Sequence, residues 1–266
     1  MKLITRLNKY FAQFFWNLLP ATIQKTVSFI WSIVYKTKFS KVFIGPFAVR
    51  YRISAEEMKK FSPASGKNEY QSFQDFFTRR LRKVFQPLHE SISPCEGLVC
   101  ETGIISELKL VNVKGRNFSV RNIFGRIGNQ IPGSHFFINI FLHNHNYHRF
   151  HSPVQGVIKS IQKIPGQLNF LRPWLYLNRQ VSEPAFVNER LVVEIESANQ
   201  ERWFLSFVGG MGVGQIKIYE HLTPGALLQC GEEMGLFLLG STCCLAVPRK
   251  KSEYKFLSKI NLGDSL

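Results

Sequence analysis

Three separate stretches of the sequence carry side chains suited to nucleophilic and acid–base chemistry. The densest is HNHNYHRFHSP, which contains His148 and His151, and the turn sequence SPCEG supplies the carboxylate of Glu96. The third is the pair Gly240-Ser241, in an apolar run near the C-terminus. A serine nucleophile needs a base and the base needs an orienting group, so a serine, a histidine and a carboxylate could act together.

The Gly240-Ser241 pair is unexpected where it stands. It interrupts GEEMGLFLLGSTCCLAVP, whose apolar residues predict one strand over residues 236–247 that is buried on both faces. In such a strand a glycine costs backbone entropy and a serine needs a hydrogen-bond partner. A bulge or a close backbone approach would explain the pair structurally. Its assignment to chemistry therefore depends on the rest of the chain.

The histidine run also has the composition of a metal site. The pair His143 and His145, with a third nitrogen, would suit a tetrahedral zinc ion. A catalytic zinc site commonly needs a further histidine or carboxylate from another strand, and the sequence has no HExxH and no second HxH. We therefore expect no metal, and a zinc-dependent hydrolase is the less favoured alternative.

Composition indicates a globular protein with anionic partners. Of its 266 residues 45% are hydrophobic and 14% aromatic, which excludes a disordered protein. Lys and Arg outnumber Asp and Glu by 34 to 18, and this favours nucleic acid, an anionic lipid surface or an acidic substrate. No RNA-binding, zinc-finger or recognition-helix pattern is present, so we expect no nucleic-acid partner. The five cysteines lack paired CxxC spacing and are expected to be reduced.

The first 36 residues predict two amphipathic helices separated by Pro20. In the first, apolar and basic side chains recur on opposite faces, and the second has an apolar stripe that includes Val27, Ile30 and Trp31. Neither has the ~20 uninterrupted apolar residues that a spanning helix requires. We expect both to lie on an anionic membrane surface. A secretory signal and a helix packed on the protein's own core are the alternatives.

The rest of the chain predicts one more helix and then a series of strands. Ser72 and Asp75 form a capping pair at the start of a helix whose apolar stripe continues to Val84. From residue 96 onward, short apolar or alternating runs are separated by Gly, Pro and Asn, with one helical turn at 119–125. These runs predict antiparallel strands at close spacing.

The predicted fold class is therefore α+β. N-terminal amphipathic helices within residues 1–90 form a membrane-associating arm, and residues 91–266 form an antiparallel, β-rich and barrel-like catalytic domain. The sequence shows no internal repeat and no low-complexity tract.

Seven motifs that occur in order along the chain belong together. The first five are SFQDFFTRRLRKVFQPL, SPCEG, KGRNFSV, NYHRFHSPVQG and FVNER, and the last two are VGGMGVGQI and GEEMGLFLLGST. Together they resemble the phosphatidylserine decarboxylases over about residues 70–250. The last motif is the most specific, because Gly-Ser-Thr after GEEMG matches the self-cleavage site of that family.

The resemblance implies that the chain cleaves itself between Gly240 and Ser241. Ser241 Oγ would attack the carbonyl carbon of Gly240 and convert the amide into an ester. β-Elimination would release a chain that ends at Gly240, and hydrolysis of the dehydroalanine left behind would give ammonia and an N-terminal pyruvoyl group. By matching position, the resemblance makes His151 the base for this step, His148 the histidine that assists substrate chemistry, and Glu96 the carboxylate that orients the base.

The pyruvoyl group is the cofactor that the resemblance implies. Its carbonyl would take the amine of phosphatidylserine and accept the electrons left by the departing CO₂, so that phosphatidylethanolamine forms. The expected partners are this lipid, an anionic phospholipid membrane, and the chain's own second cleavage product in a heterodimer, two of which could pair. The expected location is peripheral, at the cytoplasmic face of the cell membrane.

Glu96 is one departure from the family's pattern. The family has Asp in this turn, so the carboxylate keeps its charge but moves by about one bond length, and catalytic groups are sensitive to such shifts. Two outcomes follow from this substitution. Glu96 supports self-cleavage, or the protein stays uncut and is an inactive lipid-binding relative.

Overall fold

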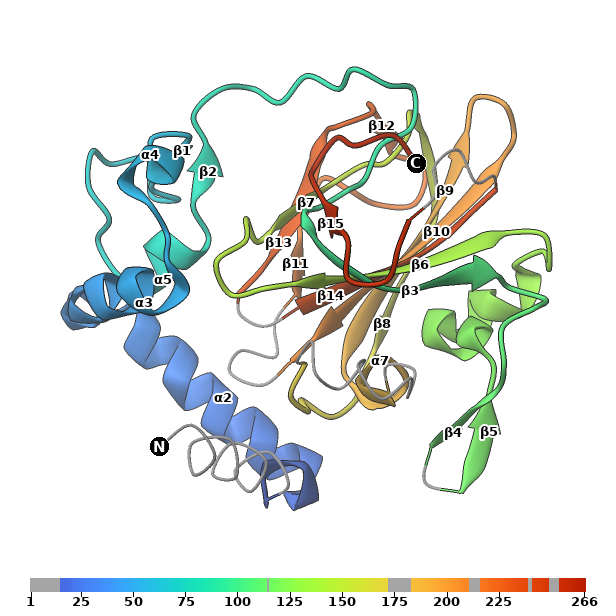
Figure 1. The fold of residues 1–266 in the computed structure, drawn as a ribbon, viewed down its shortest axis with the longest axis horizontal. Coiled ribbons are helices and arrows are strands. Elements are labelled where there is room, and N and C mark those ends of the chain that lie inside the picture. The colour runs from blue at the N-terminus through green and yellow to red at the C-terminus, as the bar shows by residue number, and fades with distance from the viewer. Residues whose placement is uncertain (1–14, 114, 172–182, 211–215, 239–240, 249–253) are drawn as a thin grey trace.

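The computed structural model describes residues 15–113, 115–171, 183–210, 216–238, 241–248 and 254–266 of the chain. Most helices lie near the N-terminus and the long strands begin at residue 97 (Figure 1). The α+β class with an antiparallel core is thereby confirmed. Most of the first amphipathic segment, up to residue 14, and Gly240 lie outside the described residues. The division of the chain at residue 90 stays a prediction.

The core of the molecule is an eight-stranded antiparallel sheet. Its strand order is linear, with β12 and β15 at the two ends, so the core that the sequence predicts as barrel-like is an open sheet in the described part of the chain. In sheet order the strands are β12 (Leu227–Leu228), β8 (Gly156–Ile164), β9 (Arg190–Ser197), β10 (Arg202–Gly209), β14 (Ser241–Val247), β6 (Phe136–Leu142), β3 (Gly97–Ile104) and β15 (Lys259–Ile260).

Strand β14 lies in the middle of this sheet and is buried along its whole length. It pairs with β10 on one side and with β6 on the other. Cys243 and Leu245 face one apolar core, whereas Cys244 and Ala246 face another on the opposite side of the sheet. The two adjacent cysteines therefore point to opposite faces, as the alternation of a strand predicts.

A smaller sheet packs on one face of the large one. Its three strands are, in order, β11 (Ile216–Ile218), β13 (Glu233–Phe237) and β7 (Arg149–His151). Phe150 of β7 stacks on Phe207 of β10 with ring centroids 3.8 Å apart. The prediction of one strand over 236–247 is wrong, because β13 and β14 belong to different sheets. The first of these strands ends at Phe237 and the second begins at Ser241.

The helical elements and two small two-stranded sheets, β1–β2 and β4–β5, complete the described fold. Ser72 caps α5 by accepting a hydrogen bond from Asp75 N, as predicted, but the helix ends at Phe77 and does not reach Val84. It stops because β2 pairs with β1 directly afterwards. The elements are α2 (Ala21–Lys36), η1 (Lys38–Phe43), α3 (Ile44–Tyr51), α4 (Ala55–Met58), β1 (Phe61–Ser62), α5 (Phe73–Phe77), β2 (Arg80–Leu81), β4 (Val111–Val113), β5 (Arg116–Phe118), η2 (Val120–Gln130) and α7 (Glu183–Val187). The predicted turn at 119–125 is thus the start of η2.

Helix α2 turns its polar face toward the β domain. Its buried residues are Gln24, Ser28 and Ser32. Gln24 Oε1 accepts a hydrogen bond from the backbone N–H of Leu168 at 2.7 Å, and its Nε2 donates to Asn169 Oδ1 at 3.2 Å. The apolar side chains of the same helix point outward: Ile23, Phe29, Ile30, Trp31 and Ile33 are each at least 44% exposed. The helix is therefore amphipathic, with its apolar side away from the protein's own core.

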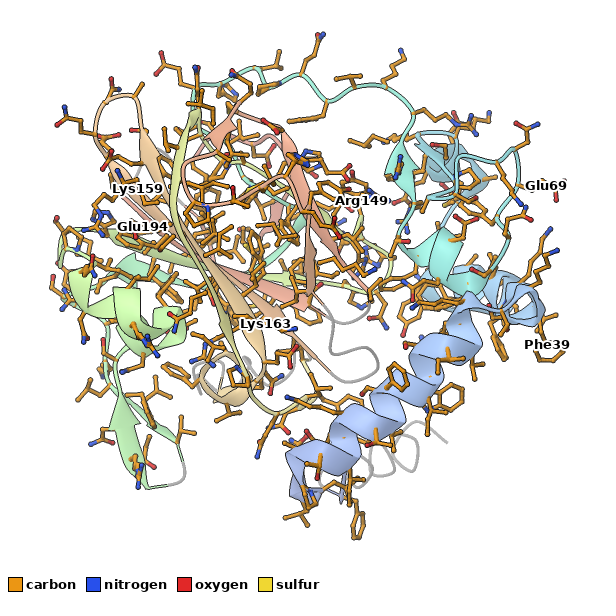
Figure 2. The ribbon with its side chains drawn as sticks, turned by 180° about the vertical axis from the view of Figure 1, so that it is seen from behind. Phe39, Glu69, Arg149, Lys159, Lys163 and Glu194 are labelled. Atoms are coloured by element: carbon orange, nitrogen blue, oxygen red, sulfur yellow. The ribbon has the colours of Figure 1, made fainter. Side chains whose placement is uncertain are left out.

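The outward apolar face continues on both sides of α2. The exposed apolar side chains there are Phe15, Leu18, Phe39, Val42, Phe43 and Val49. Figure 2 shows Phe39 at the outer end of this arm, directed away from the sheet. Among the described helices, none is both long and apolar enough to cross a membrane.

Candidate active site

Ser241 is the first residue of β14 and is fully buried. It lies opposite Leu142 at the end of β6 and Gly209 at the end of β10. Its Oγ has no hydrogen-bond partner among the described residues. The adjacent hydroxyl of Thr242 is bonded to Asn139 Oδ1 at 2.8 Å and to the carbonyl of Ile140 at 2.9 Å. Of the two neighbouring hydroxyls, only that of Ser241 is available for chemistry.

His148 lies in the turn that leads from β6 to β7 and is fully buried. Its Nδ1 lies 2.8 Å from the carbonyl oxygen of Asn146, which places the proton on Nδ1 and a lone pair on Nε2. Within the described part of the chain Nε2 has no hydrogen-bond partner. Burial, and after it the charge of Arg79, lower the pKa of His148 to about 3, so the ring is neutral at pH 7.

His151 ends β7 and is also buried. Its Nδ1 lies 2.8 Å from the carbonyl oxygen of Gly231, and its Nε2 lies 3.2 Å from the hydroxyl of Tyr147. Burial lowers the pKa of His151, although the bond to Gly231 opposes the shift. The ring is therefore neutral, with its Nε2 lone pair facing Tyr147.

Glu96 stands directly before β3 and holds the turn that carries the histidines. Its Oε1 accepts hydrogen bonds from Tyr147 N at 2.8 Å and from Asn146 Nδ2 at 3.0 Å. In the described residues the ring of His151 is bonded to Gly231 and Tyr147, and no bond joins it to Glu96. Glu96 therefore contacts the turn that carries the histidines, but it is not bonded to the His151 ring.

A second carboxylate, Glu233 of β13, is connected to His151 through Tyr147. The Tyr147 hydroxyl oxygen lies 3.3 Å from Glu233 Oε2 and 3.2 Å from His151 Nε2, so its single proton serves one of these two acceptors at a time. Arg149 and Tyr219 both bond Glu233 Oε1. Burial raises the pKa of Glu233, but Arg149 and Tyr219 outweigh it and hold the pKa below its ordinary value. Arg149 lies between the sheet and the helical arm (Figure 2) and also donates to the backbone carbonyls of Thr78 and Arg79, directly after α5.

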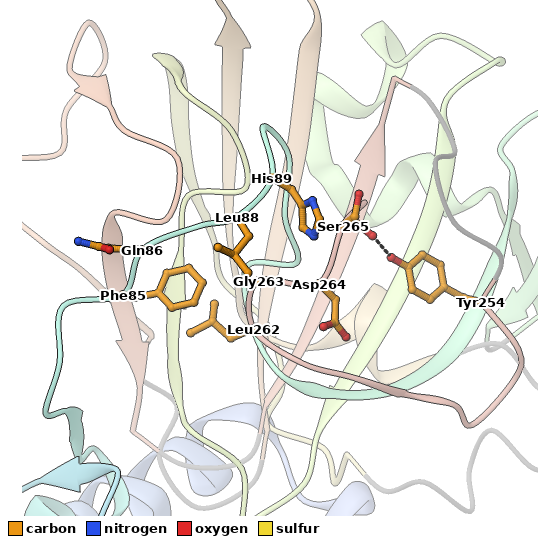
Figure 3. Close-up of a pocket in the computed structure, with 9 residues that line it drawn as sticks. All are labelled: Phe85, Gln86, Leu88, His89, Tyr254, Leu262, Gly263, Asp264 and Ser265. Atoms are coloured by element: carbon orange, nitrogen blue, oxygen red, sulfur yellow. Dashed lines mark hydrogen bonds between the residues drawn. The ribbon is translucent and has the colours of Figure 1, made fainter.

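Two hollows border the segment that joins the arm to the β domain. One, of about 460 Å³, is lined by Phe85, His89, Tyr254 and Asp264 among others (Figure 3). The other, of about 820 Å³, is lined by apolar, basic and acidic side chains, which include Glu56, Glu57, Lys59, Lys60, Leu81 and Arg82. Phe85 lines both hollows, and its ring meets that of His151 edge-on with centroids 5.6 Å apart. The two hollows thus share a residue that packs on the site.

The remaining two histidines of the run lie in the same turn. The rings of His143 and His145 have centroids 4.5 Å apart. Within the described residues, no group of three His, Cys, Asp or Glu side chains is placed to hold a metal ion. The zinc-hydrolase alternative has no ligand set in that part of the chain.

Three residues of the site were not among the predicted ones: Tyr147, Glu233 and Arg79. Each stands inside one of the seven motifs, which is the signal that could have drawn attention to it. An alternation rule shows only that a polar side chain interrupts an apolar pattern. It does not show which distant group that side chain meets, and here two partners of Tyr147, Glu96 and Glu233, lie 51 and 86 residues away.

Comparisons with known proteins show which family the chain is similar to. The family model described as phosphatidylserine decarboxylase matches residues 73–266. A phosphatidylserine decarboxylase proenzyme of Brevibacillus brevis is 30% identical over 278 residues, covering 94% of this chain and 95% of the relative. Proteins of the same name from Idiomarina loihiensis and Psychrobacter cryohalolentis are 30% and 29% identical over 85% and 79% of the chain, and over 85% and 79% of their own lengths.

These similarities define the chain as a carboxy-lyase. It belongs to the phosphatidylserine decarboxylase family. The resemblance carried by the seven sequence motifs is confirmed, and the matched region includes Glu96, His148, His151 and Ser241.

Proposed function

We propose that this protein converts phosphatidylserine to phosphatidylethanolamine and CO₂ after cutting itself between Gly240 and Ser241. The observation that carries the proposal is the buried Ser241 hydroxyl, which has no partner among the described residues and stands where the chain leaves β13 for β14. The relatives named proenzymes support a precursor that is processed. A pyruvoyl group formed at residue 241 would accept the electrons that decarboxylation releases.

The surroundings of Ser241 suit a group of that kind. Its strand neighbours are Leu142 and Gly209, so the pairing residues bring neither charge nor a competing hydroxyl. An unpaired hydroxyl in such a place costs free energy. Self-cleavage would consume it, which explains why a serine stands at the start of a fully buried strand.

The two histidines would take different parts in the chemistry. We assign His151 to removal of the Ser241 proton, and for this its Nε2 must exchange Tyr147 for Ser241 Oγ. We assign His148 to proton transfer with the substrate, because its Nε2 lone pair is buried and has no partner among the described residues. Both rings are neutral, as a base requires.

Glu96 would act on both histidines through one peptide group. The N–H of Tyr147 donates to Glu96, and the carbonyl of the same peptide, that of Asn146, accepts from His148 Nδ1. A carboxylate on the N–H polarises the peptide and strengthens its carbonyl as an acceptor. The same contact fixes Tyr147, whose hydroxyl meets His151. Glu96 is therefore a positioning residue that keeps its function despite its extra methylene.

We expect purified parent protein to separate under denaturing conditions into chains of residues 1–240 and 241–266. Glu96→Gln should slow this cleavage by about tenfold, because an amide keeps the acceptor oxygen but loses the charge that strengthens both bonds. Glu96→Asp keeps the charge and should cleave faster than Glu96→Gln. The measurement is a time course on a denaturing gel, with intact mass to locate the break.

A matched control is Glu107→Gln, which removes one carboxylate from an exposed position after β3. It should cleave at the parent's rate. If both Glu96 variants also cleave at that rate, Glu96 has no part in positioning. If the parent stays uncut while Glu96→Asp cleaves, the protein is the inactive lipid-binding relative, and the catalytic proposal is withdrawn.

We further propose that the two cleavage products remain together as a heterodimer. The smaller product would contain β14, which pairs with β10 and β6, and β15, which pairs with β3. Ser265 also forms a bridge to Ile92. Loss of the smaller product would remove the middle strand, β14, and the edge strand, β15, from the large sheet. Pairing of two such heterodimers stays a prediction.

The helical arm is proposed to hold the protein on an anionic membrane at its cytoplasmic face. Its apolar side chains point away from the β domain, while Gln24 and Lys25 attach the opposite face to residues 168–169 and to Glu189. Exposed basic residues accompany the apolar ones, as interfacial helices require: Lys36, Lys38, Lys41, Arg50 and Arg52. This orientation supports the membrane-surface interpretation over that of a core helix.

We expect the parent protein to bind vesicles that contain anionic lipid more tightly than neutral vesicles, and to lose affinity as salt rises. Phe29→Ser with Phe39→Ser should weaken binding by at least about tenfold, because each buried aromatic ring contributes roughly 1.5–3 kcal/mol. Co-sedimentation measures this. Leu110→Ser changes an equally exposed apolar residue outside the arm and should have no effect. Unchanged binding by the double variant would contradict the proposed arm.

A further inference from the structure

The fully buried arginines of the site region differ in how their guanidinium groups are satisfied. Arg149 uses Nε, Nη1 and Nη2 in hydrogen bonds and is paired with Glu233. Arg79 uses only Nη2, which donates to the carbonyls of His145 at 2.6 Å and Asn146 at 3.1 Å. Its Nε and Nη1 are buried and have no hydrogen-bond partner among the described residues. Nearby Arg190 gives a second contrast, since all three of its nitrogens donate to backbone carbonyls.

Arg79 is also fully buried, and no carboxylate of the described residues is bonded to it; the negative charge of Glu96 acts on it only from beyond ion-pair distance. The guanidinium lies 4.5 Å from the ring centroid of Phe61 and 5.5 Å from that of Phe76. The aromatic contacts hold the cation in place, but they do not replace an anion. A buried cation without a directly bonded anion is destabilising. The presence of a buried arginine at this position would be explained if an anionic ligand binds to it.

The position of Arg79 points to the active site. The carbonyl of Asn146 accepts from Arg79 Nη2 and also from His148 Nδ1 at 2.8 Å, so the two side chains meet at one oxygen atom. Phe77, two residues before Arg79, packs on the ring of His148 with centroids 4.1 Å apart. The cation thus lies beside the histidine that we assign to substrate chemistry, where the arm meets the β domain.

We propose that Arg79 binds the phosphodiester group of the phospholipid headgroup. This inference rests on the proposed function for the identity of the lipid. Arginine suits phosphate because it offers several donors and keeps its charge. The substrate's carboxylate is the less suitable anion, since it loses its charge as CO₂ leaves and a cation on it would favour the ground state over the transition state. The phosphodiester keeps its charge throughout.

The test uses full-length protein with Ser241→Ala, which can neither cleave nor turn over, so its result does not depend on whether the parent is active. Calorimetry measures binding of glycerophosphoserine, glycerophosphoethanolamine and free serine. Both phosphodiesters should bind, and Arg79→Met should weaken both by tenfold or more, with Arg79→Lys between. Arg80→Met removes the same charge from the exposed neighbouring residue and should leave binding unchanged.

Three results would overturn the proposal. In the first, Arg79→Met binds both phosphodiesters as tightly as the protein that retains Arg79. In the second, Arg79→Met weakens the binding of free serine but not that of the phosphodiesters. In the third, the Ser241→Ala protein binds neither phosphodiester. Because Arg79 also holds the histidine turn, thermal melting accompanies each titration. If Arg79→Met does not fold, a competition experiment on the Ser241→Ala protein tests the proposal instead. Inorganic phosphate should displace glycerophosphoserine and acetate should not, and equal displacement by both would contradict phosphate recognition.

Discussion

Ser241→Ala should leave the protein as one uncut chain of 266 residues without decarboxylase activity. The variant lacks the oxygen that attacks residue 240 and the atoms from which a pyruvoyl group is made, so the expected loss is complete. Intact mass under denaturing conditions distinguishes one chain from two. Phosphatidylethanolamine formation from phosphatidylserine in detergent micelles gives the activity.

The same substitution should not weaken the fold. Ser241 Oγ is buried and has no partner among the described residues, so its removal leaves no other group unsatisfied. We expect the free energy of unfolding to stay the same or to rise by about 1 kcal/mol. Ser206→Ala is the matched control, because Ser206 is a fully buried serine on neighbouring β10 that donates to the carbonyl of Ile123. That variant should still cleave. A cut chain in Ser241→Ala would overturn the proposed cleavage.

Substitutions of the two histidines should separate self-cleavage from decarboxylation. His151→Gln should stay uncut, because loss of a general base typically costs 10²- to 10⁴-fold in rate. His148→Gln should cleave into two chains and yet form phosphatidylethanolamine at least about 10²-fold more slowly. A denaturing gel reports the first step and product analysis the second. The opposite pattern, with His148→Gln uncut and His151→Gln cut, would exchange the two roles.

The pH dependence of the first step follows from the state of His151. Burial lowers the pKa of this histidine, so it is neutral at pH 7 and gains a proton only at a pH below that of an ordinary histidine. The cleavage rate should therefore be flat around neutrality and fall as the pH drops through that lowered value. A fall centred above the ordinary histidine range would show that another group controls the step.

Much of the architecture follows from periodicity, because an antiparallel sheet places alternate residues on alternate faces. The strands after residue 96 were predicted in this way, and the Ser72 cap was predicted from its pairing with Asp75. The break between β13 and β14 was not, since an apolar run looks the same whether it crosses one sheet or changes sheets. The orientation of α2 was also open. Gln24 meets Leu168 and Asn169 far along the chain, and no local pattern contains that contact.

Sequence motifs supplied four residues of the proposed site, but they pointed neither to Tyr147, Glu233 and Arg79 nor to the contacts among these residues. Ser241, His148, His151 and Glu96 come from motifs, whereas the contact of Glu96 with the turn at Tyr147 depends on how two strands bring that turn beside it. The extra methylene of Glu96 therefore could not be judged from the sequence. Its effect depends on where the acceptor must lie, and in the structure that place is a backbone N–H.

The central position of β14 sets an order of events during biosynthesis. Ribosomes make the chain from its N-terminus, so β6 and β10 are complete before the strand that fills the space between them. Ser241 can reach its buried place only when that strand inserts, and until then the nascent chain has no assembled site. Self-cleavage would thus depend on folding: only a molecule in which β14 has paired with β6 and β10 would form the pyruvoyl group and become active.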